Sequence, residues 1–350
     1  METILISYGS QLVFDLEDIS SVAVVRRAGA ILARELKFNE TRAGQLALVI
    51  TEAATNILKH ANHGQILLRA LVQGEHAGVE VLVIDNGSGI ANFDWHAEDG
   101  NSTAGSYGIG LGALRRLSQH FDIYTYTDKG TVIWMVLWAG NETPKPAHWQ
   151  LGAVCVPIKG EEVSGDNWAM AAHEKKLTLI VADGLGHGPE AAKAADAAIA
   201  LAGDIVSPGV VKGAPAIVQS PSVILQRAHQ ALQGTRGAAL AVGQINSELG
   251  TLTFAGVGNI SVCILYREGS RHLVSHNGIV GSNLRKLQEF SESWERDALL
   301  VAHSDGINTR WNLGLYPGLV HCHPALIAAV IYRDFTRGRD DATVVVVREQ

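Results

Sequence analysis

The sequence predicts an α+β protein built from two domains. Amphipathic helix patterns and strand patterns alternate in the first 140 residues, strands dominate the rest, and a polar, proline-containing stretch separates the two regions. A chain of 350 residues is long enough to bury two hydrophobic cores. We therefore expect residues 1–139 and residues 149–350 to form the two domains, with residues 140–148 as the linker.

The first region contains several segments with clear periodicity. Residues 1–20 alternate apolar and polar side chains and are predicted to form a strand. Apolar residues at helical spacing predict helices over 21–36, 40–60 and 110–120. Further strands are expected at 65–72, 79–84, 121–126 and 131–138. Residues 85–108 are rich in Gly, Ser and Asn and are predicted to be a loop. Beyond the linker, the helix patterns lie near 189–203, 220–233 and 323–336.

The composition limits the classes of function. A hydrophobic content of 47% with 18% charged residues is typical of a soluble globular protein. A net charge of −7 without a long basic run argues against a nucleic-acid partner. The longest apolar stretches are too short to cross a bilayer, and no secretory signal is seen at the amino terminus, so we expect no membrane association. Three scattered cysteines do not suggest a disulfide framework, and a cytoplasmic location is expected.

Acidic residues recur at predicted strand ends in the second region. The apolar run Leu177–Val181 leads into Asp183, and the backbone of Gly184 follows it. Asp166 and Asp305 lie in similar glycine-containing turns, and Asp340 and Asp341 directly precede the apolar run 344–347. Carboxylates together with backbone oxygens are the ligands that a hard divalent cation prefers. If their strands are neighbours, these acids form a metal site; taken singly, Asp-Gly is also a common turn.

Polar residues in the first region suggest a nucleotide site. Glu52 and Asn56 are four residues apart and share a face of the second helix, which Lys59 continues. Exposure to solvent would also explain these side chains. A predicted strand then runs into Asp85, followed by spaced glycines, and a further set opens the third helix, where free backbone N–H groups can bind phosphate. These glycines are Gly87, Gly89, Gly108, Gly110 and Gly112. The spacing matches neither a Walker A loop nor a dinucleotide fingerprint.

Three motifs of the first region, TEAATNILKHA, DNGSGI and SYGIGLGALRRL, resemble in order the N box and glycine boxes of Bergerat-fold (GHKL) ATPases. Specifically, they look like the small serine kinases of bacterial partner-switching systems, which phosphorylate STAS-domain proteins or act as anti-sigma factors. The resemblance implies helices on one face of a mixed sheet and binding of ATP with Mg²⁺. It also implies that Glu52 is the base, that Asn56 binds Mg²⁺ and that Asp85 recognises adenine. The glycines would lie against the nucleotide, and the loop 95–107 would form a lid. A domain that binds ATP without transferring phosphate is the alternative.

The second region resembles the SpoIIE-type branch of the PPM (PP2C-like) phosphatases. The pieces SGDNW, VADGLGHGP, GAALAVGQI, FAGVGNI, HSDGI and RDDATVVV occur in order. The resemblance implies a four-layer α-β-β-α sandwich that holds two Mn²⁺ or Mg²⁺ ions. Asp183 would bridge both ions, and Gly184 would offer its carbonyl. Asp305 and Asp340 would bind one metal and Asp166 the other, while Asp341 would support these ligands.

Two histidine-containing segments carry weaker signals. His187 is either a proton donor to the leaving serine oxygen or a structural loop residue. The run His321-Cys322-His323 looks like part of a zinc site, but no second pair of ligands lies at a suitable spacing.

Together the resemblances imply a metal-dependent serine/threonine phosphatase fused to an ATP-binding, kinase-like domain. Such a protein would set the phosphorylation state of a STAS-domain protein. Two alternatives stay open: the first domain only senses nucleotide and regulates the phosphatase, or it binds a sigma factor. The oligomeric state stays open as well.

Overall fold

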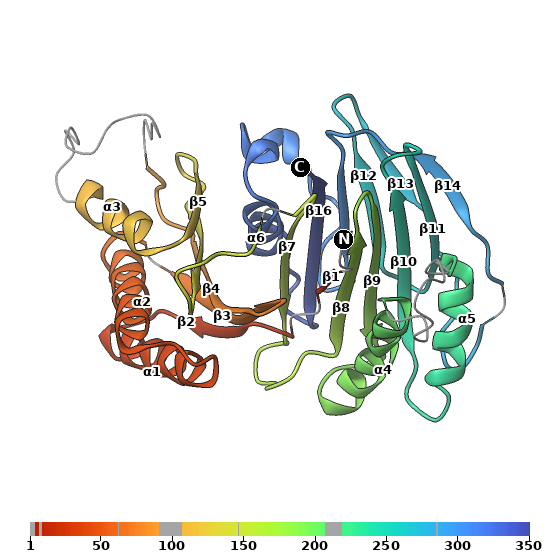
Figure 1. Cartoon of the computed structure of the whole chain (residues 1–350), viewed down its shortest axis with the longest axis horizontal. Coiled ribbons are helices and arrows are strands. Elements are labelled where there is room, and N and C mark those ends of the chain that lie inside the picture. The colour runs from red at the N-terminus through yellow and green to blue at the C-terminus, as the bar shows by residue number, and fades with distance from the viewer. Residues whose placement is uncertain are drawn as a thin grey trace. The chain divides into compact units, whose positions relative to one another are not determined.

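The computed structural model describes residues 4–6, 9–61, 63–90, 107–145, 147–206, 219–284 and 286–350. Figure 1 shows the chain with its helices and strands. The contacts divide it into two compact units. Unit 1 combines the described residues within 1–10, 146–311 and 331–350, and unit 2 combines those within 11–145 and 312–330. The mixed α+β fold class predicted from the sequence is confirmed.

Unit 2 is built on a five-stranded sheet with the strand order β2-β3-β4-β6-β5. Its strands are β2 (Leu12–Asp15), β3 (Gly64–Gln73), β4 (His76–Asp85), β5 (His120–Thr125) and β6 (Thr131–Trp138). Every ladder between these described strands is antiparallel, whereas the resemblance implied a mixed sheet. The helices α1 (Ile19–Glu35), α2 (Glu40–His60) and α3 (Tyr107–Leu117) pack on one face of this sheet (Figure 1).

Capping residues and apolar periodicity explain where these helices begin and which face they bury. The carboxylate of Asp18 accepts from the N–H of Ser20 at 2.7 Å, and the side chain of Asn39 accepts from Arg42 N–H at 2.8 Å. The inward face of α2 is fully buried along its length, with Leu46, Val49, Ile50, Ala53, Ala54 and Ile57. Gly29 lets α1 approach α2 closely, because a Cβ at this position would collide with the side chain of Ile50.

The segment 312–330 joins unit 2 from the far end of the sequence. It contains the short helices η1 (Leu313–Leu315) and η2 (Leu319–His321) and the start of α6 (Pro324–Phe335), which ends in unit 1. The backbone N–H of His323 donates to Asp122 Oδ2 at 2.7 Å, and its ring stacks on Trp134 with 3.6 Å between centroids. Trp134 in turn donates to Glu80 at 3.0 Å. His323 of the His-Cys-His run therefore packs against the sheet of unit 2.

Unit 1 contains two further antiparallel sheets within the described residues. The six-stranded sheet has the order β1-β8-β9-β10-β11-β14, and the five-stranded sheet has the order β13-β12-β15-β16-β7. The strands of the first are β1 (Ile4–Ile6), β8 (Asp166–His173), β9 (Lys176–Gly184), β10 (Ala238–Asn246), β11 (Thr251–Val257) and β14 (Phe290–Ser293). Those of the second are β7 (Trp149–Val156), β12 (Ser261–Leu265), β13 (Ser270–Leu273), β15 (Leu299–His303) and β16 (Ala342–Glu349).

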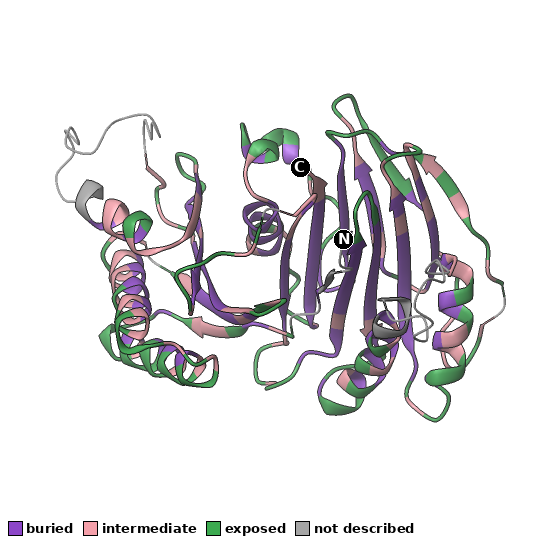
Figure 2. Ribbon diagram, viewed as in Figure 1, coloured by how far each residue is buried: buried purple, intermediate pink, exposed green. Residues whose placement is uncertain are grey.

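The core of unit 1 lies between these two sheets. Side chains such as Trp168 and Val181 from the first sheet pack with Leu300 and Val345 from the second. The outer face of the six-stranded sheet is covered by α4 (Pro189–Val206) and α5 (Pro221–Ala231). Figure 2 shows the result, with buried strands and helices exposed on their outer faces. No helix among the described residues is both long and apolar enough to cross a membrane.

The prediction of one strand over residues 1–20 was wrong. The structure has two strands here, and they belong to different sheets: β1 pairs with β8 in unit 1, and β2 pairs with β3 in unit 2. Gly9 and Ser10 lie between them and form no strand. Alternation along a sequence reveals extended backbone but does not identify the partner strand, because pairing depends on residues far away in the chain.

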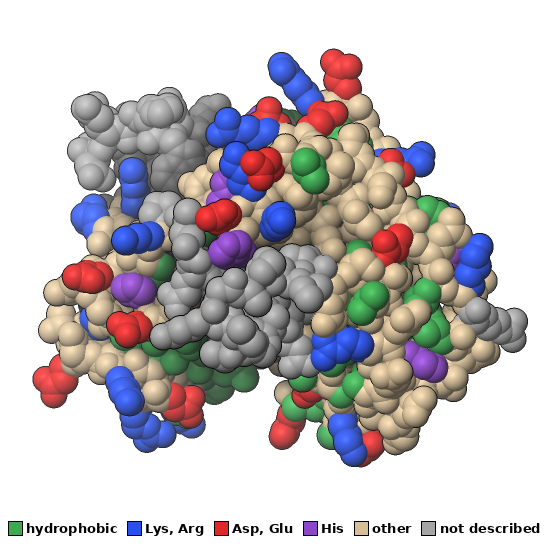
Figure 3. Space-filling view, turned by 45° about the vertical axis from the view of Figure 1, so that its right-hand side comes forward, with side chains coloured by type: hydrophobic (Ala, Val, Ile, Leu, Met, Phe, Trp, Pro, Cys, Tyr) green, Lys and Arg blue, Asp and Glu red, His purple; other side chains and the backbone are tan. Residues whose placement is uncertain are grey.

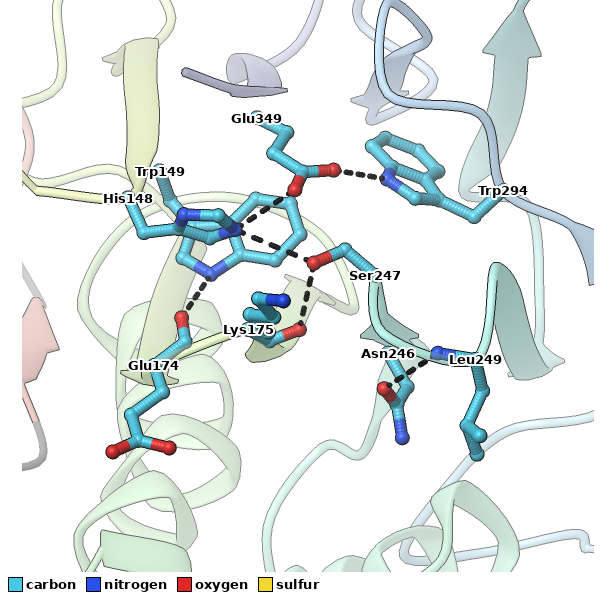
Figure 4. A network of polar contacts seen from close by, with 9 residues as sticks. All are labelled: His148, Trp149, Glu174, Lys175, Asn246, Ser247, Leu249, Trp294 and Glu349. Carbon is cyan, nitrogen blue, oxygen red and sulfur yellow. Dashed lines mark hydrogen bonds and ion pairs between the residues drawn. The ribbon is translucent and has the colours of Figure 1, made fainter.

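A polar network links the two sheets of unit 1 at one end of the sandwich (Figure 4). His148 Nε2 lies 2.9 Å from Glu349 Oε1 and 3.3 Å from Ser247 Oγ, so it joins β16 to the turn between β10 and β11. Glu349 also accepts from Trp294 Nε1 at 3.3 Å, and Trp149 Nε1 donates to Glu174 O at 3.1 Å. Residue 341, next to the opposite end of β16, belongs to the acidic cluster described below.

Candidate functional site

The predicted acidic residues come from both sheets of unit 1. Asp166 and Asp183 are register partners on the neighbouring strands β8 and β9 of the six-stranded sheet. Asp305 follows β15, and Asp340 lies two residues before β16, the strand that pairs with β15 in the five-stranded sheet. The sequence led us to expect four neighbouring strands. The structure instead brings together two neighbouring pairs from facing sheets.

The charges of these side chains act on one another. Burial, followed by the carboxylates of Asp166, Asp305, Asp340 and Asp341 in that order, raises the pKa of Asp183 to about 9. The pKa of Asp166 is raised to about 7, mainly by burial and then by Asp341 and Asp340, against hydrogen bonding from Ser304 and Thr343. Like charges gathered in a buried place disfavour ionisation, and a bound cation would reverse that effect.

The donor set fits a divalent cation. Asp166 is 4% exposed, and its Oδ2 atom is buried without a hydrogen-bond partner. A cation would satisfy this oxygen with the ligand chemistry that Mg²⁺ and Mn²⁺ favour. Within the described residues, no three Asp, Glu, His or Cys side chains are already gathered closely enough to hold an ion. If a cation binds here, the carboxylates would have to move closer together around it.

Asp341 holds the backbone around the cluster. Its Oδ1 atom accepts from Ile158 N–H and its Oδ2 atom from Gly165 N–H, both at 2.7 Å. The side chain is 2% exposed, and a Cβ at Gly306 would collide with the backbone of Asp341. Both carboxylate oxygens of Asp341 are thus engaged with the loops that present the other acids.

Three neighbours of the acids define the rest of this site. Gly184 has no room for a side chain because Ala191 of α4 packs against it, and its N–H donates to Gly165 O at 3.0 Å. His187 is paired with Glu161, with Nδ1 2.8 Å from Oε1, and its side chain is 55% exposed. Asn259, which sequence reasoning missed, donates to Asp305 Oδ2 at 2.7 Å. In the sequence, Asn259 is distinguished only by its position in FAGVGNI, one of the segments that resemble the PPM phosphatases.

The nucleotide motifs meet in unit 2 around a small cavity of about 50 Å³. The cavity lies between α2, the end of β4, β6 and α3, and it is lined by Ala53, Asn56, Ile57, His60, Val83, Asp85, Gly87, Ser88, Gly89, Ile90, Leu111, Thr131 and Ile133. Of the residues predicted from sequence, Asn56, Asp85, Gly87 and Gly89 line it. Ligand pockets usually reach about 300 Å³ or more, so this cavity must widen to hold a nucleotide.

Hydrogen bonds and tight turns position Asp85. Its Oδ1 atom accepts from Gly87 N–H at 2.8 Å and from Thr131 N–H at 3.2 Å. Gly89 has φ +69°, and a Cβ there would collide with Tyr126 O. Gly130, also at positive φ, leaves no room for a Cβ beside Asp85 O. Thr131 and Gly130 come from β6 and the turn before it, about 45 residues beyond Asp85, and sequence reasoning missed them.

Glu52 and Asn56 lie half-buried on α2, next to the start of α3. A Cβ added to Gly110 would collide with Glu52 Oε1 and would lie 3.4 Å from Asn56 Nδ2. Gly110 therefore brings the first turns of α3 against both predicted catalytic side chains. Glycine at the start of a helix allows such a close approach of the backbone.

Other predicted residues lie at the edge of this site. Lys59 is exposed and does not line the cavity, whereas its neighbour His60 does. Gly108 and Gly112 lie in the first two turns of α3. The predicted lid, residues 95–107, lies almost entirely outside the described residues.

Comparison with known families matches both halves of the chain. Residues 16–137 match the histidine kinase-like ATPase domain family. Residues 173–350, half of the chain, match the stage II sporulation protein E (SpoIIE) family.

Individual relatives show the same division. The serine/threonine-protein kinase RsbT of Bacillus subtilis is 31% identical over 117 residues, which are 33% of this chain and 88% of RsbT. The phosphoserine phosphatase RsbX of the same organism is 28% identical over 151 residues, 43% of this chain and 70% of RsbX.

Solved structures add to this comparison. A structure from work on the bacterial stressosome is 32% identical and covers 58% of this chain and 100% of its own, with a TM-score of 0.50. Magnesium-bound RsbX is 23% identical, with a TM-score of 0.51, and covers 60% of this chain and 99% of its own; it shows the fold. The chain therefore belongs to the SpoIIE family and consists of a PP2C-type serine/threonine phosphatase domain preceded by a kinase-type ATPase domain similar to RsbT.

Proposed function

We propose that the protein controls one phosphorylation state through two opposed sites. In this proposal residues 149–350 remove phosphate from serine or threonine of a STAS-domain protein, and residues 1–139 bind ATP and phosphorylate such a protein. The observation that carries the phosphatase half is the raised pKa of Asp183 and Asp166, which is caused by burial and by neighbouring carboxylates from two facing sheets. Such a cluster has a physical purpose if it binds divalent cations.

The residues of unit 1 would hold two Mn²⁺ or Mg²⁺ ions through Asp183 and the carboxylates around it. When bound, such ions lower the pKa of water and neutralise phosphate oxygens. In the absence of metal, Asp166 and Asp183 retain protons because their pKa values are raised. They would release these protons when the cations bind. Asp341 keeps the backbone of Ile158 and Gly165 in place, and Asn259 orients Asp305. No side chain is required as a nucleophile.

In the kinase-like half, Glu52 would accept the proton of the attacking serine hydroxyl, and Asn56 would bind the Mg²⁺ that accompanies ATP. Asp85, held by Gly87 and Thr131, would accept a hydrogen bond from the adenine amino group. Phosphoryl transfer depends mainly on positioning and charge neutralisation, and the close approach of Gly110 to Glu52 supports such positioning.

A second candidate is that unit 2 binds nucleotide or a sigma factor without transferring phosphate. The exposed position of Lys59, which does not line the cavity, favours binding without transfer. In that case nucleotide would regulate the phosphatase and Glu52 would be dispensable.

One experiment separates these functions. A phosphorylated STAS-domain protein is incubated with the full chain, with and without Mn²⁺ and with and without ATP, and phosphate release is measured. The unphosphorylated protein is incubated with labelled ATP in parallel. Metal-dependent release together with ATP-dependent labelling supports both activities. Release without labelling supports the second candidate, and no release with Mn²⁺ contradicts the phosphatase assignment for this substrate.

A further inference from the structure

Beside the acidic cluster of unit 1 lies a cavity of about 560 Å³. Its walls are formed by Asp305, Asn308, Thr309, Arg310, Arg337, Arg339 and Asp340. Two of these residues are predicted metal ligands, so the cavity opens directly onto the proposed metal centre. The three arginines come from two loops: Arg310 lies beyond Asp305, and Arg337 and Arg339 immediately precede Asp340.

These three arginines have no partner for their guanidinium groups. All three are exposed, and none forms a side-chain hydrogen bond or an ion pair with any residue that the structure describes. Some arginines of the described chain are paired, including Arg271 with Glu292 and Arg333 with Asp334, whereas others, such as Arg26 and Arg296, are exposed on their own. On the face shown in Figure 3, basic and acidic side chains are largely interspersed. What distinguishes Arg310, Arg337 and Arg339 is that their guanidinium groups line one cavity together with two acids of the cluster.

The backbone holds two of the arginines near the acids. Arg337 N–H donates to Gly306 O at 2.8 Å, next to Asp305, and Arg310 N–H donates to Asn308 Oδ1 at 3.0 Å. Burial and Asp340 raise the pKa of Asp305, and the positive charge of Arg337 opposes this effect. Arg337 therefore lies within electrostatic reach of the metal centre.

We infer that Arg310, Arg337 and Arg339 bind the phosphoryl group of the substrate in this cavity. The inference rests on the proposed phosphatase function. Guanidinium groups match phosphate oxygens in shape and charge, and a phosphomonoester carries up to two negative charges. Once cations neutralise Asp305 and Asp340, the three arginines dominate the charge of the cavity. They would hold the oxygens that the metal centre leaves uncovered.

The test uses the full chain with Mn²⁺ and two probes, p-nitrophenyl phosphate as substrate and inorganic phosphate as competitive inhibitor. Arg337→Gln and Arg339→Gln are each expected to raise KM and the Ki of phosphate by about 5- to 10-fold, with kcat changed less than about twofold. Arg337→Lys should recover part of the loss, since lysine keeps the charge but not the fork of donors. Arg271→Gln, which removes an exposed arginine of unit 1 outside the cavity, is the matched control.

A second readout does not require activity. Inorganic phosphate should raise the Tm of the Mn²⁺-loaded wild-type protein and should fail to do so when all three arginines are replaced by glutamine. If the wild type hydrolyses p-nitrophenyl phosphate but the triple variant keeps its KM and Ki, the arginine assignment is wrong and the phosphatase assignment stands. If a phosphoserine peptide with acidic flanks loses affinity while the Ki of phosphate is unchanged, the arginines contact the flanks and the phosphoryl assignment is overturned. If the wild type hydrolyses neither probe with Mn²⁺ or Mg²⁺, the proposed function fails first.

Discussion

The acidic cluster of unit 1 and the nucleotide site of unit 2 are assembled in different ways. The acids lie on strand ends between residues 166 and 341 and come from two facing sheets. In the nucleotide site, the helix α2 alone supplies Glu52 and Asn56, and the cavity is completed by residues from 83 to 133. The first site depends on long-range topology, whereas the second depends on a helix face and the turns next to it. We therefore expect the acidic cluster to lose activity mainly through substitutions that change charge. The nucleotide site should lose activity through substitutions that make small changes of shape.

The largest expected effect follows from removing the central acid. Asp183→Asn should lower phosphatase kcat/KM at least about 100-fold, because this side chain is surrounded by all the other carboxylates of the cluster. Nucleotide binding by unit 2 should be unchanged. Phosphate release and binding of a fluorescent ATP analogue measure the two sites separately. Full phosphatase activity in this variant would remove Asp183 from the centre of the site.

The matching change in unit 2 is Glu52→Ala. If Glu52 is the base, ATP-dependent labelling of a STAS-domain protein should fall by about 100-fold, the low end of the effect of a general base. ATP affinity and phosphatase activity should stay near wild-type values. Labelling at the wild-type rate would contradict the role of Glu52 and favour a purely regulatory unit 2.

Titration distinguishes the two sites as well. The folded pKa of Asp183 is about 9 and that of Asp166 about 7, against a reference of 3.8, so folding binds protons at both positions. The contribution of these two carboxyl groups to the free energy of unfolding is complete below about pH 4. It is lost as the pH rises through 7 and then 9. The Tm of the protein in a chelator should therefore fall between pH 5 and 9, and Mn²⁺ should flatten this decline. Asp183→Asn should also flatten it, whereas an equally steep decline in that variant would exclude Asp183 as its source.

A subtler change tests the shape of the nucleotide site. Gly110→Ala places a Cβ against the carboxylate of Glu52, which must move away. We expect ATP-dependent labelling to fall about tenfold while the Tm changes little, because the end of the Glu52 side chain can shift. Gly44→Ala, a change on α2 where a Cβ meets no atom within 4 Å, is the control. Equal effects of both substitutions would indicate a general response of the helices.

The smallest effect is expected away from both sites. Glu349→Ala removes the partner of His148 and of Trp294 Nε1 in the network of Figure 4. It should lower the free energy of unfolding by about 1–2 kcal/mol, the usual cost of losing such hydrogen bonds. Chemical denaturation measures this value, and Glu268→Ala at an exposed position is the control. A change of kcat would show that this end of the sandwich is coupled to the acids at the other end.

Local patterns predicted much of the structure and of the two sites. The bounds expected for the second helix, residues 40–60, are those of α2, because its apolar spacing and the cap at Asn39 are local signals. The pair Glu52 and Asn56 was found for the same reason, since a spacing of four defines a helix face. Asp183 and Asp305 were predicted because each stands between an apolar run and a glycine, Asp166 because it lies in a glycine-containing turn, and Asp340 because an apolar run follows it. The fold class and the two families followed from these motifs and were confirmed.

Tertiary structure decided what no local pattern contains. It assigned β1 and β2 to different sheets, placed His323 against Trp134 in unit 2, and gathered Arg310, Arg337 and Arg339 around one cavity. The sequence by itself determined which segments form helices and strands, and which residue types stand at their ends, because these depend on neighbours within a few residues. Which strand ends meet depends on pairing and packing between segments more than a hundred residues apart, and those contacts exist only once the chain has folded.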